Sequence, residues 1–156
     1  MEFRVEARSY ADPVVAQLVA AVQAEYLTRY GGLDEAAVVP GEFDPPGGLF
    51  LLGLLDGEAV ATGGWRRINR GQGGAAVEIK RMFVVAAARR RGLARLILAE
   101  LEATARAAGA DQVVLNTGNQ QPEAIALYES SGYSPVDGFG HYASHPGALF
   151  YGKAIG

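Results

Sequence analysis

Hydrophobic and polar positions alternate every two residues in several short stretches, which is the period of β-strands. Glu2–Arg8 places apolar residues between charged ones, as a half-buried strand does. Leu49–Leu55 and Glu58–Arg67 flank Asp56-Gly57, a dipeptide suited to a tight hairpin turn because that turn needs positive φ at both central residues. With Ala75–Val85, these stretches predict an antiparallel meander.

Other stretches have the longer period of helices. Leu93, Ile97, Leu101 and Ala105 recur every four residues and predict a helix over Gly92–Ala108. Two more helices are expected, because Pro13 and Pro122 suit a first helical position and glycines follow at Gly31-Gly32 and Gly132. In the first of them the expected apolar face is Val14, Leu18, Ala21, Val22 and Tyr26, and Leu33–Val39 is expected to be a short additional helix.

The order of these elements predicts an α+β fold. Gln112–Asn116, Tyr133–Val136 and Leu149–Ala154 read as three later strands, which makes about seven in all. The strand before Gly92 and the strand after the following helix should pair in parallel. We therefore expect a mixed, mostly antiparallel sheet with helices on both faces, in a single domain spanning residues 1–156.

Composition excludes several classes of protein. The 156 residues include no cysteine, so disulfides and zinc–thiolate sites are excluded, and a formal charge of −3 argues against nucleic-acid binding. The sequence shows no signal peptide and no apolar run of membrane-spanning length, which predicts a cytoplasmic protein without membrane contact. Acidic residues gather at Glu25, Asp34, Glu35, Glu42 and Asp44, which weakly favours a cationic ligand on that side.

A basic glycine turn lies between a strand and a helix at residues 89–92. Gly92 lets a phosphate approach the backbone closely, and the unpaired amides and dipole of a helix start attract an anion. Arg89, Arg90 and Arg91 are equally compatible with a solvated basic turn.

Spacing distinguishes these two interpretations. Arg89-x-x-Gly92-x-Ala94 follows a strand and precedes Ala-Ile-Ala-Leu-Tyr-Glu-Ser-Ser-Gly-Tyr at 124–133. Over roughly Ala76–Val136 the sequence resembles the GCN5-related N-acetyltransferase (GNAT) superfamily. The resemblance implies a sheet with two splayed central strands and acetyl-CoA as co-substrate without a metal. The cofactor-binding residues that it implies are Met82, Phe83, Val84, Val85, Arg89, Arg90, Arg91, Gly92, Leu93, Ala94, Arg95, Asn116, Ala124 and Tyr128.

Tyr128 and Glu78 are the catalytic candidates that the resemblance implies. Tyr128 would donate a hydrogen bond to the leaving thiolate, although as a lone tyrosine it would read as a core aromatic residue. Glu78 would take the proton of the amine, directly or through water, or it is simply paired with Arg66, Arg67 or Arg81.

The acceptor side is less defined by the sequence. The family's asparagine ahead of the tyrosine is replaced by Gln121, so Asn116, or else Asn119, is expected to bind the cofactor instead. Four aromatic residues could form either the wall of the acceptor pocket or part of the core: Trp65, Tyr26, Tyr30 and Phe43. The loop residues His141 and His145 are candidates for a place near the acceptor or for ordinary surface positions.

The leading hypothesis is an N-acetyltransferase acting on a small-molecule or peptide amine in a ternary complex. Two alternatives are a non-catalytic coenzyme A or acyl-CoA binding module of the same fold and a phosphate-binding regulatory domain. The family resemblance also makes a homodimer possible.

Overall fold

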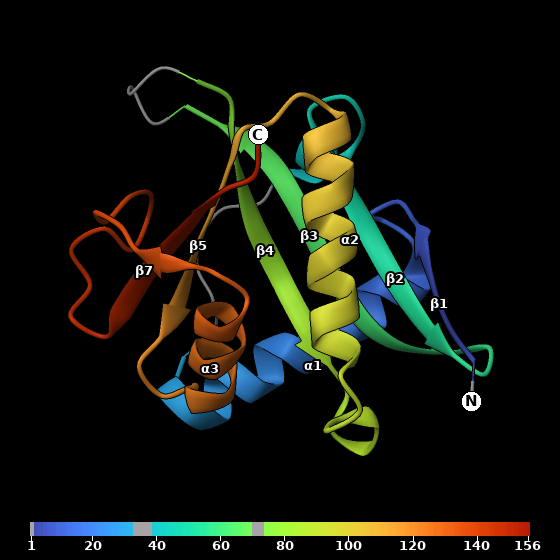
Figure 1. Ribbon diagram of the computed structural model, residues 1–156. Coiled ribbons are helices and arrows are strands. Elements are labelled where there is room, and N and C mark those ends of the chain that lie inside the picture. The colour runs from blue at the N-terminus through green and yellow to red at the C-terminus, as the bar shows by residue number, and fades with distance from the viewer. Residues whose placement is uncertain (1, 33–38, 70–73) are drawn as a thin grey trace.

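The computed structural model describes residues 2–32, 39–69 and 74–156. A seven-stranded sheet with the order β1-β2-β3-β4-β5-β7-β6 forms its centre (Figure 1). The strands are β1 (Phe3–Ala7), β2 (Gly48–Leu55), β3 (Glu58–Ile68), β4 (Ala76–Val84), β5 (Gln112–Gly118), β6 (Ser134–Pro135) and β7 (Ala148–Ala154). The helices are α1 (Pro13–Tyr30), α2 (Leu93–Ala107) and α3 (Pro122–Ser130), with single 3₁₀ turns at Pro40–Phe43 and Ala86–Ala88.

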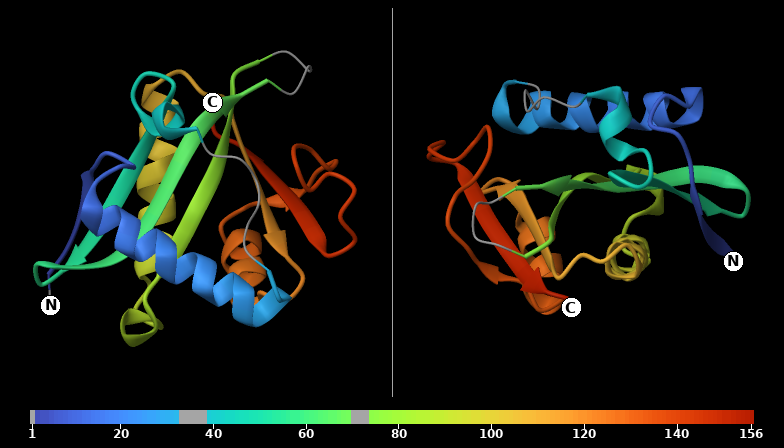
Figure 2. Two further views of the ribbon diagram at one scale, coloured as in Figure 1. Left: turned by 180° about the vertical axis from the view of Figure 1, so that it is seen from behind. Right: turned by 90° about the horizontal axis from the view of Figure 1, so that it is seen from above.

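The expected fold class is confirmed. All neighbouring strands pair antiparallel except β4 and β5, which pair in parallel and are joined through α2. Helix α1 lies on one face of the sheet, and α2 and α3 lie on the other, so the molecule has three layers (Figure 2).

Local sequence signals explain where the helices begin and end. Asp12 caps α1 by accepting a hydrogen bond of 2.8 Å from the amide of Val14, and Gly31 ends the helix with φ of 72°. Residues 33–38 of the expected helix Leu33–Val39 lie outside the described residues.

Two apolar clusters cover the two faces of the sheet. The predicted face of α2 is fully buried, since Leu93, Ile97, Leu101 and Ala105 are at most 2% exposed. Helix α1 buries Val15, Leu18 and Val22, of which Val15 and Leu18 belong to the second cluster. The prediction for Val14 was wrong, because the helix turns it outward and 37% of it is exposed.

The parallel pair β4 and β5 separates after a short contact. Only Ala76, Val77 and Glu78 of β4 face partners on β5, at Gln112, Val113 and Val114. Both strands then continue, to Val84 and to Gly118, without pairing to each other, which confirms the splayed central pair. Figure 1 shows the gap between them widening toward the end of α2 that carries its N-terminus.

Residues 2–32, 39–69 and 74–156 contain neither a candidate membrane span nor a candidate metal-binding group. No helix there has both the length and the apolar character needed to cross a bilayer. Within the same residues, no three or more His, Cys, Asp or Glu side chains are grouped so that they could bind a metal ion.

Candidate active site where two strands diverge

A cavity of about 560 Å³ lies where β4 and β5 have separated. Its walls come from segments far apart in the sequence: the end of α1, the middle of β4, the end of β5 and the loop that precedes β7. The described residues that line it are Tyr26, Tyr30, Gly32, Lys80, Asn116, Thr117, Gly118, Gln121, His141, Tyr142, Ser144, His145, Gly147 and Ala148.

Tyr30 holds the end of α1 against the end of β5. Its hydroxyl oxygen accepts hydrogen bonds from the amide of Gln120 (3.2 Å) and the side chain of Gln121 (3.3 Å). The ring lies directly on the backbone of Gly118, where a Cβ would overlap the hydroxyl oxygen and Cζ. Gly118 therefore provides the close approach that lets this ring form part of the cavity wall.

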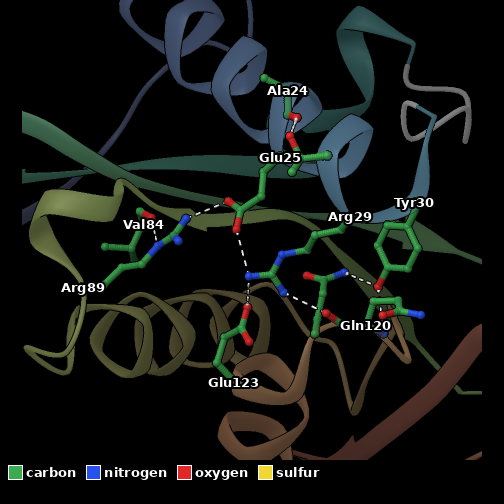
Figure 3. Close-up of polar contacts among 10 residues, drawn as sticks. Ala24, Glu25, Arg29, Tyr30, Val84, Arg89, Gln120 and Glu123 are labelled. Atoms are coloured by element: carbon green, nitrogen blue, oxygen red, sulfur yellow. Dashed lines mark hydrogen bonds and ion pairs between the residues drawn. The ribbon is translucent and has the colours of Figure 1, made fainter.

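A chain of ion pairs joins α1 to the segments that follow both diverging strands (Figure 3). Glu25 accepts from Arg89 at 2.6 Å and from Arg29 at 3.0 Å, and Arg29 also pairs with Glu123 at the start of α3. Arg29 further donates to the carbonyl of Gln120 at 2.9 Å. These contacts position α1, and with it Tyr26 and Tyr30, across the opening between the strands.

The electrostatics of the Arg29–Glu123 ion pair favour the charged form of both groups. Burial is the largest single influence on the pKa of Glu123 and acts to raise it. The hydrogen bond and the charge of Arg29, a backbone hydrogen bond and the charge of Arg89 together outweigh burial, so the pKa of this carboxyl lies below its ordinary value. The hydrogen bond from Arg29 to Glu123 is likewise the main cause that raises the pKa of Arg29.

The glycine turn leaves the start of α2 open. Gly92 caps the helix with φ of 76°, no side chain caps it, and no atom lies within 4 Å of the place where a Cβ would stand. Arg90 also has a positive φ, of 66°. The first amides of α2, from Leu93 to Arg95, belong to the first turn, whose N–H groups have no partner within the helix. The turn can therefore receive an anion.

Arg89 and Arg95, unlike the first backbone amides of α2, already use their side chains in hydrogen bonds. Arg89 donates to the carbonyl of Val84 at 2.8 Å as well as to Glu25, and Arg95 donates to the hydroxyls of Ser130 and Ser131. Arg89 must therefore exchange partners before its side chain can bind a phosphate.

The edge of β4 that faces β5 lacks a strand partner from Ile79 to Val84. Backbone groups on such an edge require hydrogen-bond partners, which a ligand with amide groups can supply. Met82, Phe83 and Val84 belong to this segment, but the carbonyl of Val84 already accepts from Arg89 at 2.8 Å. The amide of Val85 donates to Val60 of β3 at 2.8 Å.

Tyr128 lies buried on α3, next to Tyr133, with ring centroids 5.7 Å apart in an edge-to-face arrangement. Burial is the main cause that raises its pKa well above the ordinary value, and the neighbouring Tyr26 adds to the shift. Tyr26 lines the cavity, whereas Tyr128 is not one of the described lining residues. Its hydroxyl keeps its proton and can act as a hydrogen-bond donor.

Glu78 is tied to Arg66 on the α1 face of the sheet. One carboxylate oxygen accepts from Nε and Nη2 of Arg66, at 3.2 and 3.1 Å, and Arg66 also binds Glu42 at 2.8 Å. Arg66 is thus the partner among the three arginines considered. Glu78 is absent from the described lining of the cavity, so a proton could reach it only through an intermediary such as water.

The structure divides the other candidates clearly. Asn116, Tyr26, Tyr30, His141 and His145 line the cavity. Ala124 packs beside the main apolar cluster, on α3.

For Trp65 and Phe43, the structure selects the core over the pocket wall. Trp65 is buried in the cluster that contains α2 and donates to Thr104 at 3.0 Å, and Phe43 is buried between Tyr10 and Phe50 on the α1 face. Both are core residues.

Sequence reasoning missed Lys80 and Gly118 as lining residues. The period of β4 could have identified Lys80, because it lies two residues from Glu78 and two-residue spacing places side chains on one face. Gly118 had no comparable local signal, since its role depends on Tyr30, which is 88 residues away in the chain.

Comparison with known proteins gives consistent results. The family model of the acetyltransferase (GNAT) family matches residues 15–133. An IAA acetyltransferase of Azospirillum brasilense is 37% identical over 106 residues, which cover 68% of this chain and 67% of that protein. Escherichia coli YjgM, described as an uncharacterized N-acetyltransferase, is 31% identical over 134 residues, covering 81% and 78%.

Solved structures show the same architecture. A crystal structure from Klebsiella pneumoniae superposes with a TM-score of 0.81 at 28% identity, covering 99% of this chain and 98% of that one. The PaiA N-acetyltransferase of Thermoplasma acidophilum, solved in complex with coenzyme A, has a TM-score of 0.73 at 13% identity and 99% coverage of both chains.

Proposed function

The chain belongs to the acetyltransferase (GNAT) family, and from this premise we propose that it transfers the acetyl group of acetyl-CoA directly to a primary amine in a ternary complex. The observation that carries the proposal is the separation of β4 from β5 after three residue pairs, beside the open start of α2. A relative's complex with coenzyme A, on the same fold, supports the identity of the co-substrate.

The described residues fit acetyl-CoA. The uncapped first turn of α2 and the turn of Arg89–Gly92 would hold the two phosphates. The edge of β4 that has no partner on β5, including Met82 and, once Arg89 has released its carbonyl, Val84, would bind the amide groups of the pantetheine arm. An amide of this edge aimed at the acetyl carbonyl would stabilise the oxyanion that forms during transfer, an effect of about 3–4 kcal/mol for one such donor elsewhere.

Transfer forms one bond and breaks another. The amine nitrogen attacks the thioester carbonyl carbon, the C–S bond breaks, and the amine loses a proton to a base, while coenzyme A leaves as a thiolate. We assign Tyr128 as the hydrogen-bond donor to that thiolate. Because burial raises its pKa, complete proton transfer to a thiolate, whose pKa is near 8.5, is uphill, and donation of a hydrogen bond is the favoured role.

Glu78 remains our candidate for the base, acting through water. An amine with pKa near 10 is mostly protonated at neutral pH, so its proton must be taken by some group. The bond to Arg66 orients this carboxylate, and Lys80 is the next residue on the same face of β4.

The test replaces Tyr128 by phenylalanine and follows release of coenzyme A thiol with a panel of amines. We expect kcat to fall about 10–100-fold, while calorimetry with coenzyme A shows a nearly unchanged Kd. Tyr133→Phe is the matched control, because Tyr133 is a buried neighbour whose hydroxyl donates to Glu102 instead. It should lower stability but leave kcat within about threefold.

Glu78→Gln separates the base from the donor. We expect kcat to fall, because glutamine cannot accept the proton of the amine. If neither variant lowers transfer while coenzyme A still binds, these residues are not catalytic and the non-catalytic binding module becomes the better description.

A further inference from the structure

The charge of the cavity lining indicates the class of acceptor. Its described residues include the cation Lys80 and the imidazoles of His141 and His145, and no aspartate or glutamate. Asn116 and Ser144 add neutral groups that can donate hydrogen bonds. A lining with this balance favours a ligand that carries negative charge.

Two of the acidic residues noted in the sequence have arginine partners outside the cavity lining. Glu25 is neutralised by Arg29 and Arg89, and Glu42 is bound to Arg66. Asp34 and Glu35 lie outside the described residues. The excess of acidic residues seen in the sequence therefore does not translate into an acidic cavity among the residues that the structure describes.

His145 is held as a donor rather than a base. The backbone amide of Gly147 donates to Nδ1 of its ring at 3.1 Å, so Nδ1 carries a lone pair and the proton of the neutral ring is on Nε2. The rings of His141 and His145 both contact Tyr142 edge-on, with centroids 4.7 and 5.8 Å away. This packing fixes the two imidazoles at the cavity wall.

We propose that the acceptor is a small amine that also carries a carboxylate, as an α-amino acid does, and that Lys80 and His145 orient this carboxylate. The proposal rests on the proposed function, of which it names the substrate class. Tyr26, Tyr30 and Tyr142 provide aromatic walls, which suit an acceptor with an apolar side chain.

A matched set of acceptors tests this with the unmodified protein. L-Phenylalanine, L-phenylalaninamide and 2-phenylethylamine share the ring and the amine but differ in the carboxylate. We expect kcat/KM to be about 10–100-fold higher for phenylalanine, the range for one charge-assisted hydrogen bond. Lys80→Met and His145→Gln should reduce this ratio mainly through KM, since they remove binding of the carboxylate.

A binding experiment separates this proposal from the proposed function. Calorimetry compares N-acetyl-L-phenylalanine with its amide on protein saturated with coenzyme A. Preference for the acid without transfer to any amine would support the carboxylate site and contradict the enzymatic assignment. If the protein acetylates the amide or a diamine as fast as phenylalanine, the carboxylate site alone is overturned. If neither ligand binds and no amine is acetylated, both the carboxylate site and the proposed function are overturned.

Discussion

Gly118→Ala should displace Tyr30 from the cavity wall. The φ of Gly118 is not positive, so the backbone conformation at this position permits alanine. The new Cβ, however, would overlap the hydroxyl oxygen and Cζ of Tyr30 and lie 2.9 Å from Cε1. Since 38% of Tyr30 is exposed, its ring can swing outward instead of forcing the strand to move.

The expected cost follows from the contacts that the ring would lose. Its hydroxyl accepts from Gln120 and from Gln121, and each net hydrogen bond is worth about 0.5–1.5 kcal/mol. Because both lie near solvent, we expect a loss of about 1–2 kcal/mol in the free energy of unfolding. This corresponds to roughly 2–8 °C in Tm for a chain of this size. The KM for the amine should rise, while the Kd for coenzyme A should stay nearly constant.

A double-mutant cycle measures this contact directly. In a Tyr30→Ala background there is no ring to displace, so Gly118→Ala should be neutral or slightly stabilising. Gly41→Ala is the matched control, because no atom lies within 4 Å of its Cβ position and its φ is not positive. An equal loss from Gly118→Ala in both backgrounds would refute the reasoning, since the cost would then not come from Tyr30.

Two further predictions concern buried polar groups. Glu102 accepts hydrogen bonds from Tyr133 at 2.8 Å and from Lys153 at 2.9 Å. Glu102→Leu should therefore lower the free energy of unfolding in urea by about 2–3 kcal/mol, and a loss below about 0.5 kcal/mol would contradict this. Burial is the main cause that raises the pKa of Tyr128, Tyr133 and Tyr151. Ultraviolet titration of the folded protein should therefore show these three tyrosines still protonated at pH values where a free tyrosine has ionised. Because the unfolded chain ionises first, stability should fall as the pH rises above about 10, and a single ordinary titration of all seven tyrosines would argue against these burial effects.

Much of the fold could be predicted because its signals are local. The stop at Gly31 and the apolar face of α2 depend on residues within a few positions of one another, and each lies where the pattern placed it. The hairpin at Asp56-Gly57 likewise follows from turn chemistry, with positive φ at both residues. Val14 was misplaced because an apolar residue at the start of a helix can lie on either side of a broad apolar face.

The site could be predicted only in part. Resemblance identified the open start of α2 and the divergence of β4 from β5, because both are tied to short sequence motifs. The sequence could not distinguish the core residues Trp65 and Phe43 from the cavity residues Tyr26 and Tyr30. An aromatic residue packs equally well in a core and in a cavity wall.

By itself, the sequence determined the strands, the helices, the glycine turn and the family, because these depend on short-range periodicity, capping and motif spacing. The tertiary structure alone decided which side chains meet: Tyr30 on Gly118, Glu25 between Arg29 and Arg89, and Lys80 with His145 around one cavity. These contacts join segments that are distant in the chain, and they exist because the sheet order and the separation of two strands bring those segments together.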